Sequence, residues 1–139
     1  NTWLQRASFP GGVRYQHASL VIALKAYVGL GTDENVNKDD WWEYNPGTNV
    51  WTQMNDFPGA ARASVSTFTL GNRGFVMCGS NGGFFDDLWD YNQYWDSWSI
   101  RASLPGAGRR NCISFAINNI GYAGLGKGSG GIKQTFYDP

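Results

Sequence analysis

The feature that most constrains this chain is a segment of about 47 residues that occurs nearly three times within its 139 residues. Trp3, Trp51 and Trp98 open equivalent stretches at this interval. The same interval separates Phe9, Phe57 and Leu104, each followed by Pro-Gly, then Arg14, Arg62 and Arg109, and then Tyr27, Phe75 and Tyr122. Self-similarity at a fixed period is the signature of a repeat architecture, in which each unit buries its apolar faces against its neighbours.

Each repeat is predicted to form four short strands. Seven Trp, seven Tyr, eight Phe and 19 Gly favour strands joined by tight turns, because aromatic side chains suit a pleated surface and Gly adopts turn conformations. No segment sustains the 3.6-residue apolar period of a helix. The first three strands of each repeat are expected at 17–24, 25–30 and 40–44, at 65–70, 74–78 and 87–91, and at 112–118, 121–125 and 133–137. A fourth strand begins at each repeated Trp and ends before Pro-Gly, so an all-β chain is predicted.

Units of about 40 to 50 residues with four strands each are typical of propeller blades. The recurring residues are an Arg before the first strand, a Gly after the second, Tyr-Asn-Pro or Tyr-Asp-Pro after the third, and a Trp seven residues past Tyr44 and Tyr91. Through these residues the whole chain resembles the kelch repeats of bacterial surface proteins and of galactose-oxidase-like propellers. The kelch double glycine is replaced by Gly29-Leu30-Gly31, Met77-Cys78-Gly79 and Gly124-Leu125-Gly126. The resemblance implies a kelch-like β-propeller with three blades' worth of strands per chain.

Three blades do not close a ring, since propellers have about four to eight. Residues 1–139 are expected to form one propeller segment, with residues 14–57 as blade 1, 62–104 as blade 2, 109–139 as three strands of blade 3, and 1–9 as the fourth strand of a shared blade. Exposed strand edges tend to pair with another chain. The prediction is therefore a homodimer in which residues 1–9 of each chain complete blade 3 of the other, giving six blades. The alternative is that the sequence is part of a longer tandem chain.

The repeated arginines are the first candidates for a binding site. Arg14, Arg62 and Arg109 precede the innermost strand of each blade, near the axis of the ring. A ring of guanidinium groups suits carboxylates or sugar hydroxyls. Alternatively, each Arg holds the scaffold together by binding backbone carbonyls or an acidic neighbour. Because a residue repeated in every blade is more often structural, the second interpretation is favoured.

Positions at which the repeats differ are better candidates for specificity. The arginines are followed by Tyr15-Gln16-His17, Ala63-Ser64-Val65 and Arg110-Asn111-Cys112. Variable loops on a constant scaffold are typical of a binding surface. We therefore expect Tyr15, Gln16, Arg110 and Asn111 to contact a ligand. Phe84 and Phe85, in a Gly-rich loop, either stack on a sugar or partner side chain or fold back over the blade.

The net charge and the small number of reactive residues exclude several kinds of partner and site. Eleven basic and eleven acidic residues leave no net charge, which disfavours nucleic acid and anionic membranes as partners. There is no 18-residue apolar run of the kind that spans a bilayer. A single histidine and two cysteines give no catalytic set or zinc spacing. The oxygen-bearing residues between Asp33 and Asp39 lack the Gly and Glu of a calcium loop. We expect no metal and no cofactor.

These observations predict a non-catalytic propeller module that binds a glycan or a protein at its axial face and blade loops. The kelch resemblance implies a periplasmic or extracellular location. It also implies an alternative, since six-bladed kelch propellers include a sialic-acid mutarotase that uses Arg and acidic groups around a central pocket. A third interpretation is a propeller fragment whose only role is assembly.

Overall fold

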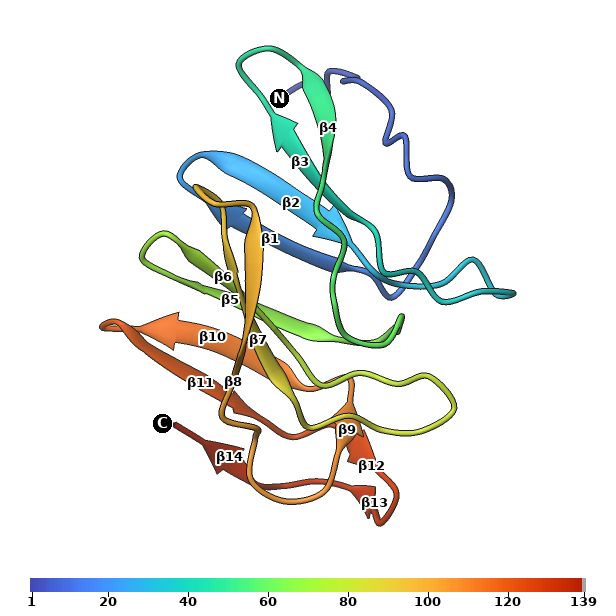
Figure 1. Cartoon of the computed structure of the whole chain (residues 1–139), viewed down its shortest axis with the longest axis vertical. Helices are drawn as coiled ribbons and strands as arrows, with labels where there is room; N and C mark the ends of the chain where they lie inside the picture. Colours follow the sequence, from blue (N-terminus) through green and yellow to red (C-terminus); the bar gives the residue numbers. More distant parts are fainter. Residues whose placement is uncertain (139) are drawn as a thin grey trace.

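The computed structural model describes residues 1–138, which form antiparallel strands and contain no helix. The sheets follow one another in chain order from the top to the bottom of Figure 1. The prediction of an all-β chain is confirmed. Among the described residues there is accordingly no helix that is able to cross a membrane.

The first two sheets are complete four-stranded units with identical topology. Blade 1 contains β1 (Ala18–Ile22), β2 (Lys25–Gly29), β3 (Trp41–Asn45) and β4 (Val50–Met54), hydrogen-bonded in that order. Blade 2 contains β5 (Ser66–Leu70), β6 (Arg73–Met77), β7 (Leu88–Asn92) and β8 (Ser97–Arg101), again in sequence order. All eight strands overlap the ranges that the repeat predicted, although β4 and β8 end at Met54 and Arg101, short of the predicted Phe57 and Leu104.

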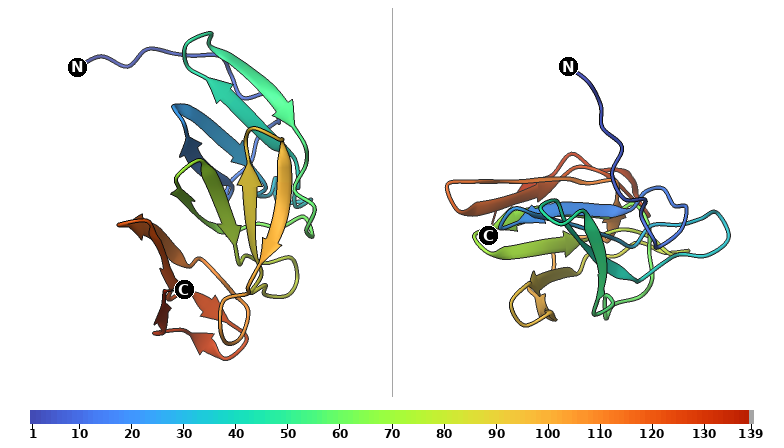
Figure 2. Two further views of the ribbon diagram at one scale, coloured as in Figure 1. Left: turned by 60° about the vertical axis from the view of Figure 1, so that its left-hand side comes forward. Right: turned by 90° about the horizontal axis from the view of Figure 1, so that it is seen from above.

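The third sheet has three strands. Blade 3 contains β10 (Ile113–Ile117), β11 (Ile120–Gly124) and the two-residue β14 (Phe136–Tyr137). Residues 1–9 form no strand within the described chain. Figure 2 shows the N-terminal segment extending away from the sheets, far from the C-terminal end. The shared blade, the dimer and the six-bladed ring remain predictions.

The register of the first two strands is the same in all three blades. Leu20 pairs with Tyr27 in blade 1, as Phe68 pairs with Phe75 in blade 2 and Phe115 with Tyr122 in blade 3. Because a slip of one residue would reverse which side chains face inward, the shared register places equivalent side chains on equivalent faces.

A fourth sheet, built from three two-residue strands, was not predicted. It consists of β9 (Arg109–Arg110), β12 (Lys127–Gly128) and β13 (Gly131–Ile132). Isolated bridges between Tyr15 and Thr32 and between Ala63 and Ser80 occupy the corresponding places in blades 1 and 2. The residue after each repeated Arg is thus attached to the loop that follows the second strand of its own blade.

Adjacent blades pack face to face through large side chains on one blade and small residues on the next. Ala18, Leu20 and Ile22 of β1 are buried. A Cβ added to Gly74 of β6 would lie 2.8 Å from Leu20 and 3.0 Å from Ile22. The same relation recurs at the next interface, where a Cβ on Gly121 would lie 2.5 Å from Phe68. Glycine is therefore required there by the close approach of a neighbouring blade.

Hydroxyl groups connect the innermost strands across blade boundaries. Thr67 Oγ1 donates to the carbonyl of Ser19 at 2.6 Å, and Thr69 Oγ1 donates to that of Val21 at 2.9 Å. Ser114 Oγ donates to the carbonyl of Thr67 at 3.0 Å. These bonds satisfy carbonyls that point away from their own sheet, and so they hold successive blades in register.

The residue before the glycine that follows the second strand has a left-handed backbone in all three blades. Leu30, Cys78 and Leu125 have φ values of 58°, 60° and 58°. Non-glycine residues in this region carry a steric cost of about 1–2 kcal/mol. The shape of the loop is thus retained in all three blades.

Candidate functional site

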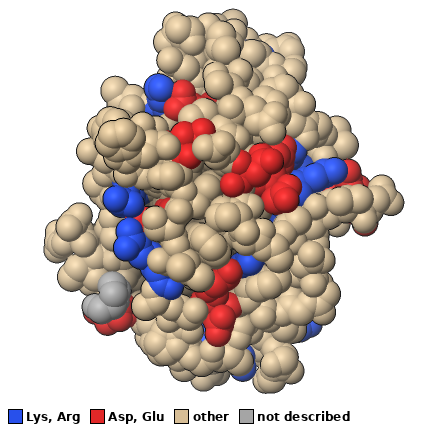
Figure 3. Space-filling view, viewed as in Figure 1, with Lys and Arg blue, Asp and Glu red and all other residues tan. Residues whose placement is uncertain are grey.

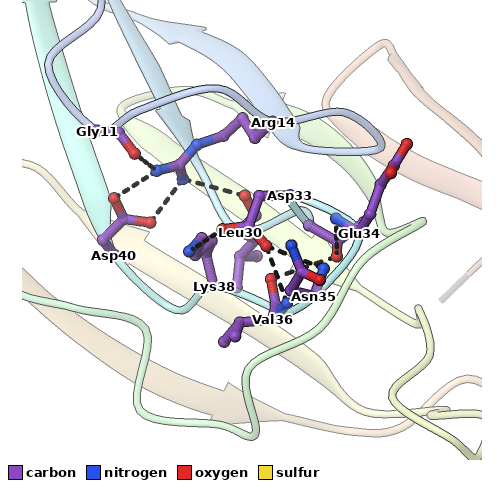
Figure 4. A network of polar contacts seen from close by, with 10 residues as sticks. Gly11, Arg14, Leu30, Asp33, Glu34, Asn35, Val36, Lys38 and Asp40 are labelled. Atoms are coloured by element: carbon purple, nitrogen blue, oxygen red, sulfur yellow. Dashed lines mark hydrogen bonds and ion pairs between the residues drawn. The ribbon is translucent and has the colours of Figure 1, made fainter.

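The first two repeated arginines are held by internal partners. Arg14 Nη1 donates to Asp40 Oδ1 at 2.6 Å and to the carbonyl of Leu30 at 3.1 Å, as Figure 4 shows. Arg62 binds both carboxylate oxygens of Asp87, Oδ2 at 2.9 Å, and the carbonyl of Cys78 at 3.1 Å. Each arginine ties the end of a second strand to the start of the third, which supports the structural interpretation over ligand contact.

The pKa of Asp40 reports this interaction. Burial alone would raise the pKa of the carboxyl group, but hydrogen bonds from Arg14 and from Trp42 Nε1 outweigh burial and hold the pKa below its ordinary value. Asp40 therefore remains ionised beside its arginine down to acidic pH.

Arg109 differs from its two equivalents because no carboxylate faces it. Its Nη1 donates to Thr135 Oγ1 at 3.1 Å, and its Nη2 donates to the carbonyl of Pro105 at 3.2 Å. Thr135 occupies the place of Asp40 and Asp87, since its carbonyl accepts from Leu125 N as theirs accept from Leu30 N and Cys78 N. The buried guanidinium of Arg109 thus leaves a positive charge that no acidic residue among 1–138 balances.

Two residues after each repeated arginine, the three blades meet in a hydrogen-bonded row. Ser64 N donates to the carbonyl of Gln16, and Asn111 N donates to that of Ser64. The Ser64 hydroxyl donates to Gln16 Oε1 at 2.9 Å. The φ values of 54°, 60° and 53° in chain order place all three residues in the left-handed region. This axial row brings predicted site residues Gln16 and Asn111 to one edge, and both are exposed.

Arg110 lies next to this row and has an unusual environment. In the small sheet Arg110 pairs directly with Lys127, so that two basic residues stand opposite each other. Like charges at paired positions destabilise a sheet unless an anion lies between them. The Nε of Arg110 is buried without a hydrogen-bond partner among the described residues. Neither side chain forms an ion pair within residues 1–138.

The two phenylalanines of the Gly-rich loop cover arginines. The Arg62 guanidinium carbon lies 3.7 Å from the ring centroid of Phe85, a distance at which the cation attracts the ring face. Arg110 lies 5.8 Å from the ring of Phe84. Both rings are partly buried, so they fold back over the blade. Tyr15, by contrast, is exposed at the end of blade 1.

The acidic loop after β2 is organised by its own hydrogen bonds. Asp33 Oδ1 accepts from Asn35 N and Val36 N, and Oδ2 accepts from Lys38 Nζ at 2.6 Å. These bonds, led by the one from Lys38, lower the pKa of Asp33 to about 2. No group of His, Cys, Asp or Glu with metal-binding geometry occurs among residues 1–138.

Cys78 and Cys112 are free thiols that meet between blades 2 and 3. The hydrogen bond between them, followed by burial, raises the pKa of Cys78, while the same hydrogen bond, together with the nearby charge of Arg109, lowers the pKa of Cys112. Cys112 occupies the register position of His17, and the repeat places Cys78 and Cys112 at the same end of neighbouring blades. Both sulfur atoms belong to the packed interface.

Charge on the visible surface is sparse and mixed. Figure 3 shows acidic and basic side chains in small groups on this face, without one continuous basic area. Along the chain the balance is uneven, because residues 109–138 contain four basic residues and a single acid, Asp138. Arg110, Asn111 and Lys127 therefore lie in a stretch with a net charge of +3 in a chain that is neutral as a whole.

The fold and the site define the class as an all-β protein of four-stranded antiparallel blades, and comparisons with known proteins agree. The solved structure of YjhT, a kelch-type propeller, matches 88% of this chain and 36% of the YjhT chain, with a TM-score of 0.73 and 21% identity. At that identity the likeness shows the fold alone.

Relatives in sequence cover part of the chain. N-acetylneuraminate epimerase of Yersinia pestis (strain Pestoides F) is 34% identical over 92 residues, and that of Shigella flexneri serotype 5b (strain 8401) is 33% identical over 89 residues. Each match covers 60% of this chain and 24% of the relative. The chain thus spans about a quarter of the length of these relatives. No family model matches the sequence.

Proposed function

We propose that this chain is part of a kelch-type propeller that binds a carboxylated sugar at the axial end of blade 3. The observation that carries the proposal is the pairing of Arg110 with Lys127, which places two basic side chains side by side without an acidic partner among residues 1–138. Asn111 is exposed on the adjoining axial row. A carboxylate between the two cations would relieve their repulsion.

The surrounding groups suit the rest of a sugar. A guanidinium presents donors in a planar fork that matches a carboxylate. The exposed amides of Gln16 and Asn111 supply donors and acceptors for hydroxyl groups, and Tyr15 supplies an aromatic face. The names of the relatives support an acidic sugar, since they are N-acetylneuraminate epimerases. The ligand that we propose is therefore N-acetylneuraminate.

The test is binding of N-acetylneuraminate to the chain, measured by saturation-transfer NMR and isothermal titration. We expect Arg110→Gln and Asn111→Ala each to weaken binding at least about tenfold, because each removes a direct contact. Asn72→Ala is the matched control for Asn111→Ala, since Asn72 is exposed in the turn between β5 and β6, and it should bind as the parent does. Equal binding of the methyl ester, which lacks the negative charge, would contradict the proposal.

A second candidate is turnover of the same sugar. The names of the relatives favour it, and Tyr15 and the exposed His17 supply titratable groups beside the axial row. NMR measurement of the rate at which epimers of N-acetylneuraminate interconvert tests this candidate. A rate raised by the protein and lost in His17→Asn indicates an enzyme, whereas binding without any acceleration indicates a binding module.

A further inference from the structure

The two cysteines occupy a pair of positions that is aliphatic at the other interface between blades. In the repeat, Leu30 of blade 1 corresponds to Cys78 of blade 2, and Val65 of blade 2 corresponds to Cys112 of blade 3. Leu30 is fully buried, and Val65 packs against the core cluster that contains it. Cys78 is likewise fully buried, and Cys112 packs against its cluster. The same two positions therefore meet at both interfaces, with carbon at one and sulfur at the other.

The side chain before the first strand has the same orientation in blades 2 and 3. A Cβ on Gly79 would lie 2.8 Å from Val65 Cγ1, and a Cβ on the equivalent Gly126 would lie 3.2 Å from Cys112 Sγ. In each blade the glycine after the second strand thus supports this side chain from its own blade. On its other side, Cys112 faces Cys78 of the preceding blade.

The two thiol groups meet across the blade boundary, where they share a hydrogen bond. Cys78 follows the end of β6 and Cys112 precedes the start of β10, so both lie just outside the strands. Gly79 N donates to the Arg109 carbonyl at 2.9 Å and holds the two segments together. A disulfide needs its sulfur atoms about 2.05 Å apart, and neither cysteine belongs to the strand pairs that such an approach would disturb.

The surroundings of the pair make Cys112 the attacking group. The hydrogen bond with Cys78 lowers the pKa of Cys112, burial opposes it, and the charge of the buried Arg109 lowers it further. That charge has Thr135 as its partner, where the other two blades have a carboxylate. The pKa of Cys78 is raised by the same hydrogen bond and by burial. Because the thiolate is the nucleophile in disulfide chemistry, Cys112 reacts first and Cys78 second.

Access from solvent also selects Cys112. Cys112 is partly buried, and so is Val65, which has a blade on each side of it. The partial exposure is thus a property of this position in the blade and does not depend on what lies beyond blade 3. Cys78 has no exposed surface, so a dissolved reagent reaches the pair through Cys112.

We propose that Cys78 and Cys112 form a redox site, which a small disulfide such as glutathione disulfide oxidises to a covalent bond between blades 2 and 3. The Cys112 thiolate attacks one sulfur of glutathione disulfide, so that a mixed disulfide forms and one glutathione thiolate leaves. Cys78 gives its proton to that thiolate and attacks the Cys112 sulfur, which releases the second glutathione. The protein thiols lose two electrons, and one glutathione disulfide becomes two glutathione molecules.

The test is incubation of the reduced, native chain with glutathione disulfide, followed by mass spectrometry of the intact chain and of its tryptic peptides. We expect the chain to lose about 2 Da, the mass of two hydrogen atoms, without keeping glutathione. Trypsin cleaves after Arg101 and so separates the two cysteines. The peptides that carry Cys78 and Cys112 should therefore be joined until dithiothreitol is added.

Two variants separate the roles of the cysteines. In Cys78→Ala the reaction should stop at the mixed disulfide, with one glutathione on Cys112. Cys112→Val carries the residue that blade 2 has at this position, and in this variant Cys78 should react at least about a hundredfold more slowly than Cys112 does in the parent chain. Circular dichroism verifies that both variants are folded.

The result for the parent chain decides the proposal without either variant. A parent chain that keeps one glutathione, that forms disulfides only between molecules, or that does not react would overturn it. So would a folded Cys112→Val variant in which Cys78 reacts as fast as Cys112 does in the parent chain.

Discussion

At the scale of single residues, the repeated arginines show how one position takes different roles in successive repeats. Arg14 and Arg62 have carboxylate partners, and Arg109 has a threonine. The pairs in blades 1 and 2 stabilise loops, while blade 3 keeps an unbalanced positive charge beside Arg110. A threonine at the partner position therefore leaves Arg109 buried without an ion pair among residues 1–138.

The pair of Arg14 and Asp40 makes stability depend on pH. Since the pKa of Asp40 is lower in the folded chain than its ordinary value, the stabilisation is present above about pH 4 and is lost as the pH falls through the lowered pKa. We predict that Asp40→Asn lowers the free energy of unfolding by about 2 kcal/mol at pH 7 and by much less at pH 2. Urea denaturation at both pH values measures the difference.

The control for this prediction is Asp39→Asn. Asp39 is exposed and adjacent, and its replacement should change the free energy of unfolding by less than about 0.5 kcal/mol at either pH. An equal loss of stability at pH 7 and pH 2 for Asp40→Asn would show that the ion pair is not its cause.

The two cysteines should differ in reactivity. The thiolate is the reactive form, the pKa of Cys112 is lowered, and Cys78 is fully buried with a raised pKa. We predict that iodoacetamide alkylates Cys112 at least about tenfold faster than Cys78 in the native chain. Peptide mapping by mass spectrometry measures both rates. In urea the two rates should become equal. Equal rates in the native chain would contradict the prediction that Cys112 reacts faster than Cys78.

At the scale of elements, the blade interface depends on glycines under large side chains. A Cβ at position 121 would lie 2.5 Å from Phe68. We predict that Gly121→Ala lowers the free energy of unfolding by about 1–3 kcal/mol, the range for overpacking. The matched control is Gly83→Ala, where a Cβ would meet no atom within 4 Å.

A second substitution, at Phe68, tests whether its contact with position 121 causes the loss of stability. Phe68→Leu should offset part of the loss caused by Gly121→Ala, because the two positions are in contact and their effects are not additive. Strict additivity of the two substitutions in urea denaturation would mean that the close approach of Phe68 does not cause the loss.

The strands could be predicted because the chain contains three repeats of about 47 residues, which differ in sequence but share one pattern of strands and turns. Tyr27, Phe75 and Tyr122 located the second strand in every copy, and the structure has the same pairing in each. An acidic neighbour of each repeated arginine was one of the expectations, but Asp40 and Asp87 were not identified as those neighbours. Asp40 and Asp87 recur with the period of their arginines, which is the signal that would have found them.

Other features of the candidate site could not be predicted from the repeat. The pairing of Arg110 with Lys127 follows from β9 and β12, two-residue strands too short to produce a periodic pattern. The repeat places Cys78 and Cys112 at the same end of neighbouring blades, but one sequence does not reveal how closely two blades approach. The folding of Phe84 and Phe85 over arginines was one of two alternatives, and only the packed structure distinguishes them.

At the scale of the whole molecule, the described residues form a row of blades with two unlike ends. One end carries a strand-like segment with an exposed Trp3, and the other has a cavity and an exposed apolar face on blade 3.

The central claim is that Arg110 and Lys127 together bind the carboxylate of an acidic sugar, and isothermal titration of N-acetylneuraminate into the chain tests it most directly. The parent chain should bind the sugar, and Lys127→Gln should bind it at least about tenfold more weakly, because the substitution removes one of the two cations. Equal binding by the parent chain and by Lys127→Gln would contradict the claim.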